Sequence, residues 1–291
     1  MDGTGITIDK LKDTGESVEE IAAGTWYVND GETGVTVYAD GTIVNGKIEP
    51  WKGKDENGNY DVEIPVIKEN GKVWEIYNAK QFKYFADVVN GEITDVTIAE
   101  NATVYLMSDL DLGARAINGD WTSEESKTAN ADLNWTPIGK LLSGNEIKAF
   151  TGTFEGNNHV IRGAYVSVNG KHAGIFGNSH TIQNLTIKDS YIYGSDLCAG
   201  GIVGALRSGE INNCHNINTT VSGNSSSVGG IVGQVQGTVK KCSNAGSVNA
   251  LSVEESSAIG GIAGQLVTGS VEGCINSGNI TGAKKYVGGI I

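Results

Sequence analysis

Apolar residues recur at a near-fixed spacing through the second half of the chain. Each recurrence is a short apolar phrase in which glycine precedes isoleucine, at 173–177, 200–204, 229–233, 260–264 and 288–291. The glycines that directly precede isoleucine are separated by 27, 29, 31 and 28 residues. Repetition at a period of about 20 to 50 residues is typical of solenoids and repeat arrays. The pattern therefore predicts a solenoid over this half of the chain.

Aligning the copies on that glycine places equivalent residues in apolar columns. The columns are Leu185, Cys214, Cys242 and Cys274; then Ile192, Val221, Val248 and Ile280; then Ala199, Val228, Ile259 and Val287. Such columns are expected where side chains stack inside a coil whose successive turns pair as parallel strands about 4.8 Å apart. The repeat therefore predicts an all-β chain built as a parallel β-helix.

Polar positions repeat with the same period. Asn216, Asn244 and Asn276 each lie two residues after a cysteine of the first column. Because asparagine tolerates tight turns, the spacing predicts a stacked asparagine ladder whose amides bond to the coils above and below. The glycine pairs are interpreted as corners, where glycine lets the backbone turn sharply between strands of one coil.

The first half of the chain has a different pattern. Residues 78–90 show helical spacing of apolar positions, with Asn78 as the predicted N-cap and Asn90-Gly91 as the stop. A short amphipathic helix before a repeat array is expected to cover the open end of its core. Residues 1–72 show weak strand alternation, so they are either a small β domain or part of one. The β-helix is predicted to occupy residues 73–291.

Three phrases in a fixed order lead to a resemblance. They are Trp-Thr-Pro-Ile-Gly at 135–139, Phe-Thr-Gly-Thr-Phe-Glu-Gly-Asn-Asn-His-Val-Ile at 150–161, and the recurring Gly-Gly-Ile-Val-Gly. From about residue 74 onward this order resembles the GLUG-motif proteins, a family of bacterial surface and secreted proteins. The resemblance implies a right-handed parallel β-helix within a large cell-surface protein, in some members an IgA-cleaving metallopeptidase. It implies no catalytic residues here, since the family's repeat is not a catalytic motif.

Charge is distributed unevenly. Residues 1–133 hold 26 acidic and 11 basic side chains, whereas residues 134–291 hold 8 and 10. The acidic half and the absence of a basic stripe argue against a nucleic-acid partner. No apolar run approaches the roughly 18 residues that span a bilayer, and the start of the chain does not read as a signal peptide. We interpret the chain as a piece of a longer extracellular or surface protein, with export and anchoring signals outside it.

The four cysteines are expected to be free thiols. Three of them share a column with Leu185, which is typical of a small apolar core site. In-register parallel neighbours rarely have disulfide geometry, and Cys198 is expected to face away from the core. No CxxC or Cys/His pairing suggests a metal site, and no cofactor is predicted.

Parallel β-helices often host polysaccharide lyases and hydrolases, but the sequence carries no catalytic pattern of that kind. The eight carboxylates after residue 133 share no column with an acid of the adjoining copy, although glycoside hydrolysis needs two facing carboxylates. Asp109 and Asp111 lack the remainder of a calcium loop and are interpreted as a half-buried strand. HExxH, GxSxG and phosphate-loop motifs are absent. We expect no enzyme; the alternatives are a β-helix carbohydrate-active enzyme and the non-catalytic region of a surface peptidase.

One outward feature is a candidate binding site. Tyr191 and Tyr193 flank the core residue Ile192 where later copies carry small polar residues. Two neighbouring exposed aromatics could stack on sugar rings or contact a protein; the alternative is that they pack under the loop at 114–134. The sequence thus predicts a non-enzymatic stalk or adhesin-like module that binds a host or bacterial surface protein or glycan.

Overall fold

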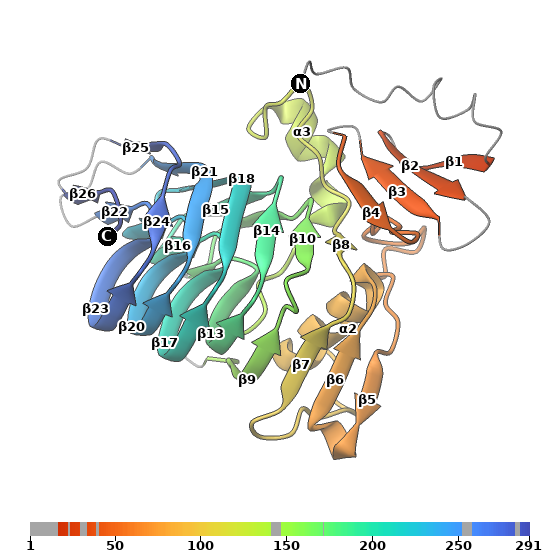
Figure 1. Cartoon of the computed structure of the whole chain (residues 1–291), viewed down its shortest axis with the longest axis horizontal. Coiled ribbons are helices and arrows are strands. Elements are labelled where there is room, and N and C mark those ends of the chain that lie inside the picture. The colour runs from red at the N-terminus through yellow and green to blue at the C-terminus, as the bar shows by residue number, and fades with distance from the viewer. Residues whose placement is uncertain are drawn as a thin grey trace.

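The chain forms a β-solenoid of about seven turns with parallel sheets, which confirms the predicted fold class. The computed structural model describes residues 17–22, 24–29, 34–38, 41–140, 147–170, 172–251, 258–282 and 286–291. Three sheets follow the solenoid, and a separate antiparallel sheet lies at one end of the stack (Figure 1).

Among the described residues, the three solenoid sheets contain eight, nine and five strands. The eight-stranded sheet has the order β23 (Ala263–Glu272), β20 (Val232–Lys240), β17 (Val203–Asn212), β13 (Phe176–Gln183), β9 (Phe150–Glu155), β7 (Thr103–Leu106), β6 (Val73–Ile76) and β5 (Val66–Lys68). The nine-stranded sheet contains β8 (Leu110–Asp111), β10 (Val160–Arg162), β11 (Tyr165–Val168), β14 (Thr186–Lys188), β15 (Tyr191–Gly194), β18 (His215–Gly223), β21 (Ser243–Ala250), β24 (Ile275–Asn276) and β25 (Ile280–Gly282). The five-stranded sheet contains β12 (His172–Ala173), β16 (Cys198–Gly200), β19 (Ser227–Gly229), β22 (Ala258–Gly260) and β26 (Tyr286–Gly288).

The remaining elements lie before the repeats. The N-terminal sheet consists of β1 (Ser17–Ala22), β2 (Thr25–Asn29), β3 (Val35–Tyr38) and β4 (Ile43–Asn45), all antiparallel. The helical elements are η1 (Glu69–Gly71), α2 (Ala79–Asn90), α3 (Glu124–Ala129) and η2 (Ala131–Leu133). Strand β5 pairs antiparallel with β6 and so extends the eight-stranded sheet. The division of the chain at residue 72 stays a prediction.

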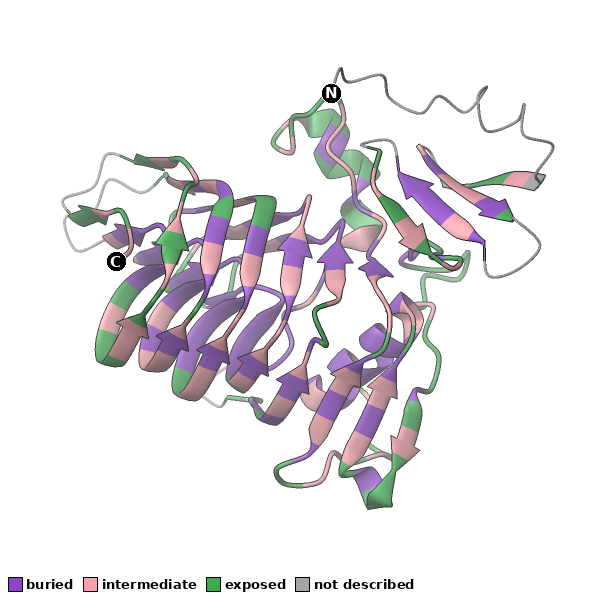
Figure 2. Ribbon diagram, viewed as in Figure 1, coloured by how far each residue is buried: buried purple, intermediate pink, exposed green. Residues whose placement is uncertain are grey.

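The predicted apolar columns are stacked in register inside the solenoid. Ile192 pairs with Val221, and Val221 pairs in turn with Val248. Ala199 pairs with Val228 in the same way, and all five side chains are fully buried. Buried residues alternate with more exposed ones along β6, β7, β9, β14 and β21 (Figure 2), as expected when one face of a sheet lines the core.

The glycine pairs lie at the corner between the five-stranded and eight-stranded sheets, as predicted. None of Gly200, Gly201, Gly229 and Gly230 has a positive φ. A Cβ atom on Gly230 would lie 2.3 Å from the carbonyl oxygen of Gly261 in the next coil. Glycine is therefore needed at the corner because successive backbones approach too closely for a side chain.

The asparagine ladder is coupled to these glycines. The Asn244 Nδ2 atom donates to Asn276 Oδ1 at 2.8 Å, and Asn216 Nδ2 donates to the carbonyl oxygen of Gly230 at 3.0 Å. A Cβ on Gly230 would also meet the Asn244 amide carbon at 2.4 Å. Contacts with other coils confirm the predicted ladder, and they show that each buried amide occupies the space that the missing glycine side chain leaves.

The first copy lacks both parts of this arrangement. Register pairs Ala173 with Ala199 and Phe176 with Val203, so two residues of the first copy stand where the next copy has three. The first copy is therefore one glycine short. In the same coil Ile187 occupies the place of Asn216. The second glycine and the asparagine are lost together, as expected if one makes room for the other.

Helix α2 covers one end of the core, as predicted. The Asn78 side chain accepts from the backbone N–H of Gln81, and Gly91 ends the helix with φ of 75°. Phe82 stacks on Trp135 with ring centroids 4.9 Å apart. The buried Asn90 side chain accepts from the backbone N–H of Gly139 at 3.0 Å and donates to the carbonyl oxygen of Pro137 at 3.1 Å. These bonds fix the Trp-Thr-Pro-Ile-Gly phrase against the helix.

All four cysteines are free, as the column pattern predicts. The Cys214 and Cys242 thiols each donate to the carbonyl oxygen of the residue two positions before, at 3.4 and 3.2 Å. The repeated contact makes the column a ladder of hydrogen-bonded thiols in the core. Buried thiols of this kind are chemically inert.

Candidate functional site

The outward face of the first coils is covered by the segment at 114–134. Trp121 from this segment stacks on Tyr191, with ring centroids 6.1 Å apart and planes 14° from parallel. Tyr165 stacks on Tyr191 from the neighbouring strand at 5.7 Å. Burial raises the pKa of Tyr191 to about 12.

This covering decides where the two candidate aromatics lie. Tyr191 is only 6% exposed, so the expectation that it is an exposed binding residue is wrong, and packing under the 114–134 segment is what occurs. Tyr193 is partly buried at the edge of the same cluster. Neither residue contributes to the cavity described below, and binding through Tyr193 stays a prediction.

The N-terminal sheet docks on the nine-stranded sheet through polar contacts. The Arg162 guanidinium lies 3.5 Å from the centre of the Tyr38 ring, and the Lys188 ammonium donates to Thr42 Oγ1 at 2.8 Å. The Trp51 backbone N–H donates to the carbonyl oxygen of Asp111 at 2.9 Å. Burial and the neighbouring Asp111 carboxylate raise the pKa of Tyr38. The contact is thus held by oriented charges and hydrogen bonds.

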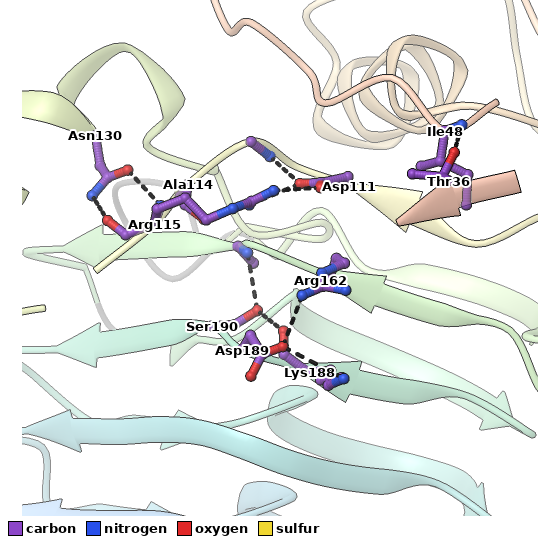
Figure 3. Close-up of polar contacts among 12 residues, drawn as sticks. Thr36, Ile48, Asp111, Ala114, Arg115, Asn130, Arg162, Lys188, Asp189 and Ser190 are labelled. Carbon is purple, nitrogen blue, oxygen red and sulfur yellow. Dashed lines mark hydrogen bonds and ion pairs between the residues drawn. The ribbon is translucent and has the colours of Figure 1, made fainter. Parts of the chain in front are cut away.

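Two carboxylates hold the basic side chains of this contact in place (Figure 3). Arg115 binds Asp111 with both Nη atoms, at 3.0 and 2.5 Å, and Arg162 lies 3.0 Å from Asp189. Bidentate guanidinium–carboxylate pairs are the geometrically specific kind of ion pair. Asp111 is therefore a buried structural partner, and the other aspartate beside Leu110, Asp109, accepts from the backbone N–H of Val160 at 3.0 Å.

A cavity of about 490 Å³ lies where the N-terminal sheet, the start of α2 and strand β8 meet. Its lining runs from Asn45 to Lys52 and includes Asp61, Glu63, Tyr77 and Lys80. Volumes of about 300 to 1,000 Å³ are typical of small-molecule sites, which often lie between substructures. The cavity is the candidate functional site.

Most of the charged groups in the cavity already have a partner. Lys80 Nζ lies 2.8 Å from Asp61 Oδ2, and Lys47 Nζ lies 3.2 Å from Glu49 Oε1. Glu63 accepts from the side-chain nitrogens of Asn78 and Gln81, at 3.2 and 2.7 Å. The Asp61 interaction raises the pKa of Lys80. The lining therefore presents mostly paired donors and acceptors, together with the exposed ammonium group of Lys52.

The arrangement is suited to holding a polar ligand. Within the described ranges, no group of three or more His, Cys, Asp or Glu residues has the geometry to hold a metal ion. Sequence reasoning missed the cavity because its lining comes from the part of the chain with the weakest periodicity. The available signal was local: Pro50-Trp51 and the alternating acids Asp61 and Glu63 precede the helix that completes the cavity.

Comparison with known proteins gives partial matches. No family model matches the chain. A 203-residue stretch is 33% identical to halomucin of Haloquadratum walsbyi, covering 68% of this chain and 2% of halomucin. The chain therefore spans only a small fraction of that relative's length.

The comparison with solved structures gives one weak match. The crystal structure of a "putative immunoglobulin A1 protease" from Bacteroides ovatus matches with a TM-score of 0.43 and 18% identity. The match covers 76% of this chain and 86% of the other. In the described part of this chain, no helix has the length and apolar character required to cross a membrane.

Proposed function

We propose that the chain is a non-enzymatic, extracellular module of a bacterial surface protein of the GLUG-motif type. It acts as a stiff stalk or adhesin-like unit that binds a protein or glycan of a host or neighbouring cell. The observation that carries the proposal is the uninterrupted stack, in which the eight-stranded sheet pairs from β6 through β23. The partial identity to halomucin, a mucin by name, supports an extracellular role.

The stack explains how such a module works mechanically. Each coil is hydrogen-bonded along its length to the next, and the Asn244–Asn276 bond adds a contact between coils inside the core. Bending the rod would stretch many of these bonds at once, because a solenoid interacts mainly through nearest neighbours along its axis. A rod of this kind holds a binding surface at a fixed distance from the cell.

The test measures retention and turnover in the same samples. The purified chain, immobilised on beads, is incubated with mucin, host matrix glycoproteins and a panel of polysaccharides, with and without Ca²⁺. We expect at least one of these probes to be retained, with no release of reducing ends or unsaturated products. Heat-unfolded chain on matched beads is the control for non-specific capture.

The rival functions give different results. Release of reducing ends would overturn the proposal in favour of a β-helix carbohydrate-active enzyme. Failure of every probe to bind above the unfolded control would remove the adhesin-like role. Retention without turnover supports the binding module. The same result is expected if the chain is the non-catalytic region of a surface peptidase.

A further inference from the structure

We propose that the cavity between the N-terminal sheet and the solenoid binds a neutral oligosaccharide. The inference rests on the proposed binding function and names its ligand class and place. Four observations carry it: the volume of the cavity, the pairing of its charges, the composition of its lining and the apolar strip beside its mouth.

The pairing of the charges selects against ionic ligands. An anion approaching Lys80 must compete with Asp61, and a cation approaching Asp61 must displace Lys80 from a 2.8 Å contact. Both side chains are partly exposed, at 44% and 37%, and breaking a pair of this kind costs on the order of 1 kcal/mol or less, about fivefold in affinity at most. A hydroxyl group avoids this cost: it donates to a carboxylate and accepts from an ammonium while the pair stays in place.

The start of helix α2 does not convert the cavity into an anion site. Helix N-termini attract anions through their free N–H groups. Here the N-cap Asn78 already accepts from the N–H of Gln81, and Glu63 binds both side chains. The lining carries five carboxylates and three lysines, so the local field also disfavours acidic sugars.

An apolar strip adjoins the cavity at Tyr77. Tyr77 lines the cavity and is 45% exposed, so it lies at the mouth. Ile76 pairs with Leu106, so Tyr77 and Met107 each directly follow a paired residue, and Ile64 lies two residues before β5, which pairs with β6. Ile64 is 65% exposed and Met107 is 37% exposed. The exposed ring of Tyr77 and these aliphatic side chains offer apolar surface, whereas the cavity offers hydrogen bonds.

A pyranose chain has both complementary features. Its rings carry C–H faces that stack on aromatic surfaces, and its hydroxyl groups both donate and accept hydrogen bonds. An extended apolar peptide would match the strip but leave the polar lining unsatisfied, at the cost of burying unpaired polar groups. A sugar chain uses both surfaces together, with one or two residues in the cavity and the next along Ile64, Tyr77 and Met107.

The experiment is calorimetric titration of the full chain with defined oligosaccharides. The probes are neutral cello-, xylo-, manno- and galacto-oligosaccharides, acidic oligogalacturonate and cationic chitosan oligomers. We expect at least one neutral probe to bind, and Tyr77→Ala to raise its Kd about tenfold, the loss of one stacking surface. Tyr286→Ala is the matched control, since Tyr286 is 56% exposed in the last coil, and it should leave Kd unchanged.

A second variant tests the polar lining separately. Asp61→Asn keeps the shape of the side chain but removes its charge, and we expect a several-fold rise in Kd for the neutral probe. Circular dichroism and thermal unfolding check that both variants stay folded. Preferential binding of the acidic or cationic probes would overturn the inference, as would failure of every neutral probe to bind.

The outcomes separate this inference from the proposed function. If a neutral probe binds equally well to Tyr77→Ala and Asp61→Asn, the cavity inference is overturned and the binding module stands. If a probe is cleaved, the proposed non-enzymatic function fails, and the loss of binding in Tyr77→Ala still reports whether the cavity holds the sugar.

Discussion

The two ends of the solenoid fill the same kind of interior with opposite kinds of residue. Aromatic rings fill the coils next to α2: Trp74, Phe82, Phe85, Trp135, Phe154 and Phe176. The later coils contain small apolar side chains, buried amides and thiols: Asn216, Val228, Ile231, Val235, Cys242, Asn244 and Val248. The backbone stacks in parallel in both regions, so the fold does not dictate what occupies its core.

The difference follows from what encloses the core at each end. Next to α2, the helix supplies Phe82 and Phe85, which both pack against Phe154. The later coils are enclosed by the three sheets, and at the corner between two of them a Cβ on Gly233 would meet the Ala199 nitrogen at 2.8 Å. Removing volume should therefore do most damage at the aromatic end, and adding volume should do most at the repeat end.

The largest effect is expected from Phe82→Ala. Phe82 is fully buried and packs against Trp135, Phe154 and Phe176. Emptying this site should lower the free energy of unfolding by about 3–5 kcal/mol, because transfer and cavity costs add. Urea unfolding measures the change. Val235→Ala, at a fully buried site in the repeat end, should cost clearly less; equal losses would contradict the comparison between the two ends.

The reverse experiment adds one methyl group to the repeat end. In Gly230→Ala the new Cβ meets both the Gly261 carbonyl and the buried Asn244 amide, so we expect a loss of about 1–3 kcal/mol or more from overpacking. Gly170→Ala is the control, because no atom lies within 4 Å of a Cβ there. If the two variants unfold at the same urea concentration, close approach is not why glycine recurs.

The repeat half of the fold was predictable because each coil repeats the same pattern of apolar positions. Ile192, Val221 and Val248 form a column in the sequence and pair in the structure. The repeat period did not reveal the physical role of Gly230. A glycine in the sequence is equally compatible with a sharp turn and with a close approach of two backbones. The missing glycine beside Gly174 was also hidden, because only pairing between strands fixes which residues are equivalent.

The candidate site was not predictable in the same way. Trp51, Asp61 and Lys80 meet through contacts that no period links, and the cavity exists only once the N-terminal sheet has docked. The burial of Tyr191 depends on Trp121, which reaches back from a segment without strand or helix periodicity in the sequence. Outward position on a strand predicts exposure only where nothing else covers the sheet.

Replacing Tyr191 and Tyr193 separately tests whether the stacked, covered ring contributes more to stability than the ring at the edge of the cluster. Tyr191→Ser removes a ring that stacks on Trp121 and Tyr165, and we expect it to cost about 2–3 kcal/mol in the free energy of unfolding. Tyr193→Ser, at the edge of the cluster, should cost about 1 kcal/mol or less. Thermal unfolding of both variants measures the difference, and a larger loss for Tyr193 would show that the covering segment does not depend on the stacked ring.

The smallest effect is an alkaline destabilisation by the repeat-end thiols. Burial raises the pKa of Cys198 to about 12, and the hydrogen bond with Cys214 together with burial raises that of Cys242 to about 12. An unfolded thiol ionises near pH 8.5. Above about pH 8.5 the unfolded chain loses thiol protons that the folded chain retains. The free energy of unfolding therefore falls as the pH rises above this value and recovers when the pH is lowered again.

The expected loss between pH 7.5 and 9 is about 1 kcal/mol or less for each thiol. Cys198→Ala should remove the part of this loss that the Cys198 thiol contributes. Alanine suits the position because Ala258 stands in the same column as Cys198 and Ser227. Urea unfolding at the two pH values measures this difference. An unchanged pH dependence in Cys198→Ala would mean that the thiol ionises as readily in the folded chain as in the unfolded one, and that the packing around Cys198 does not exclude water from it.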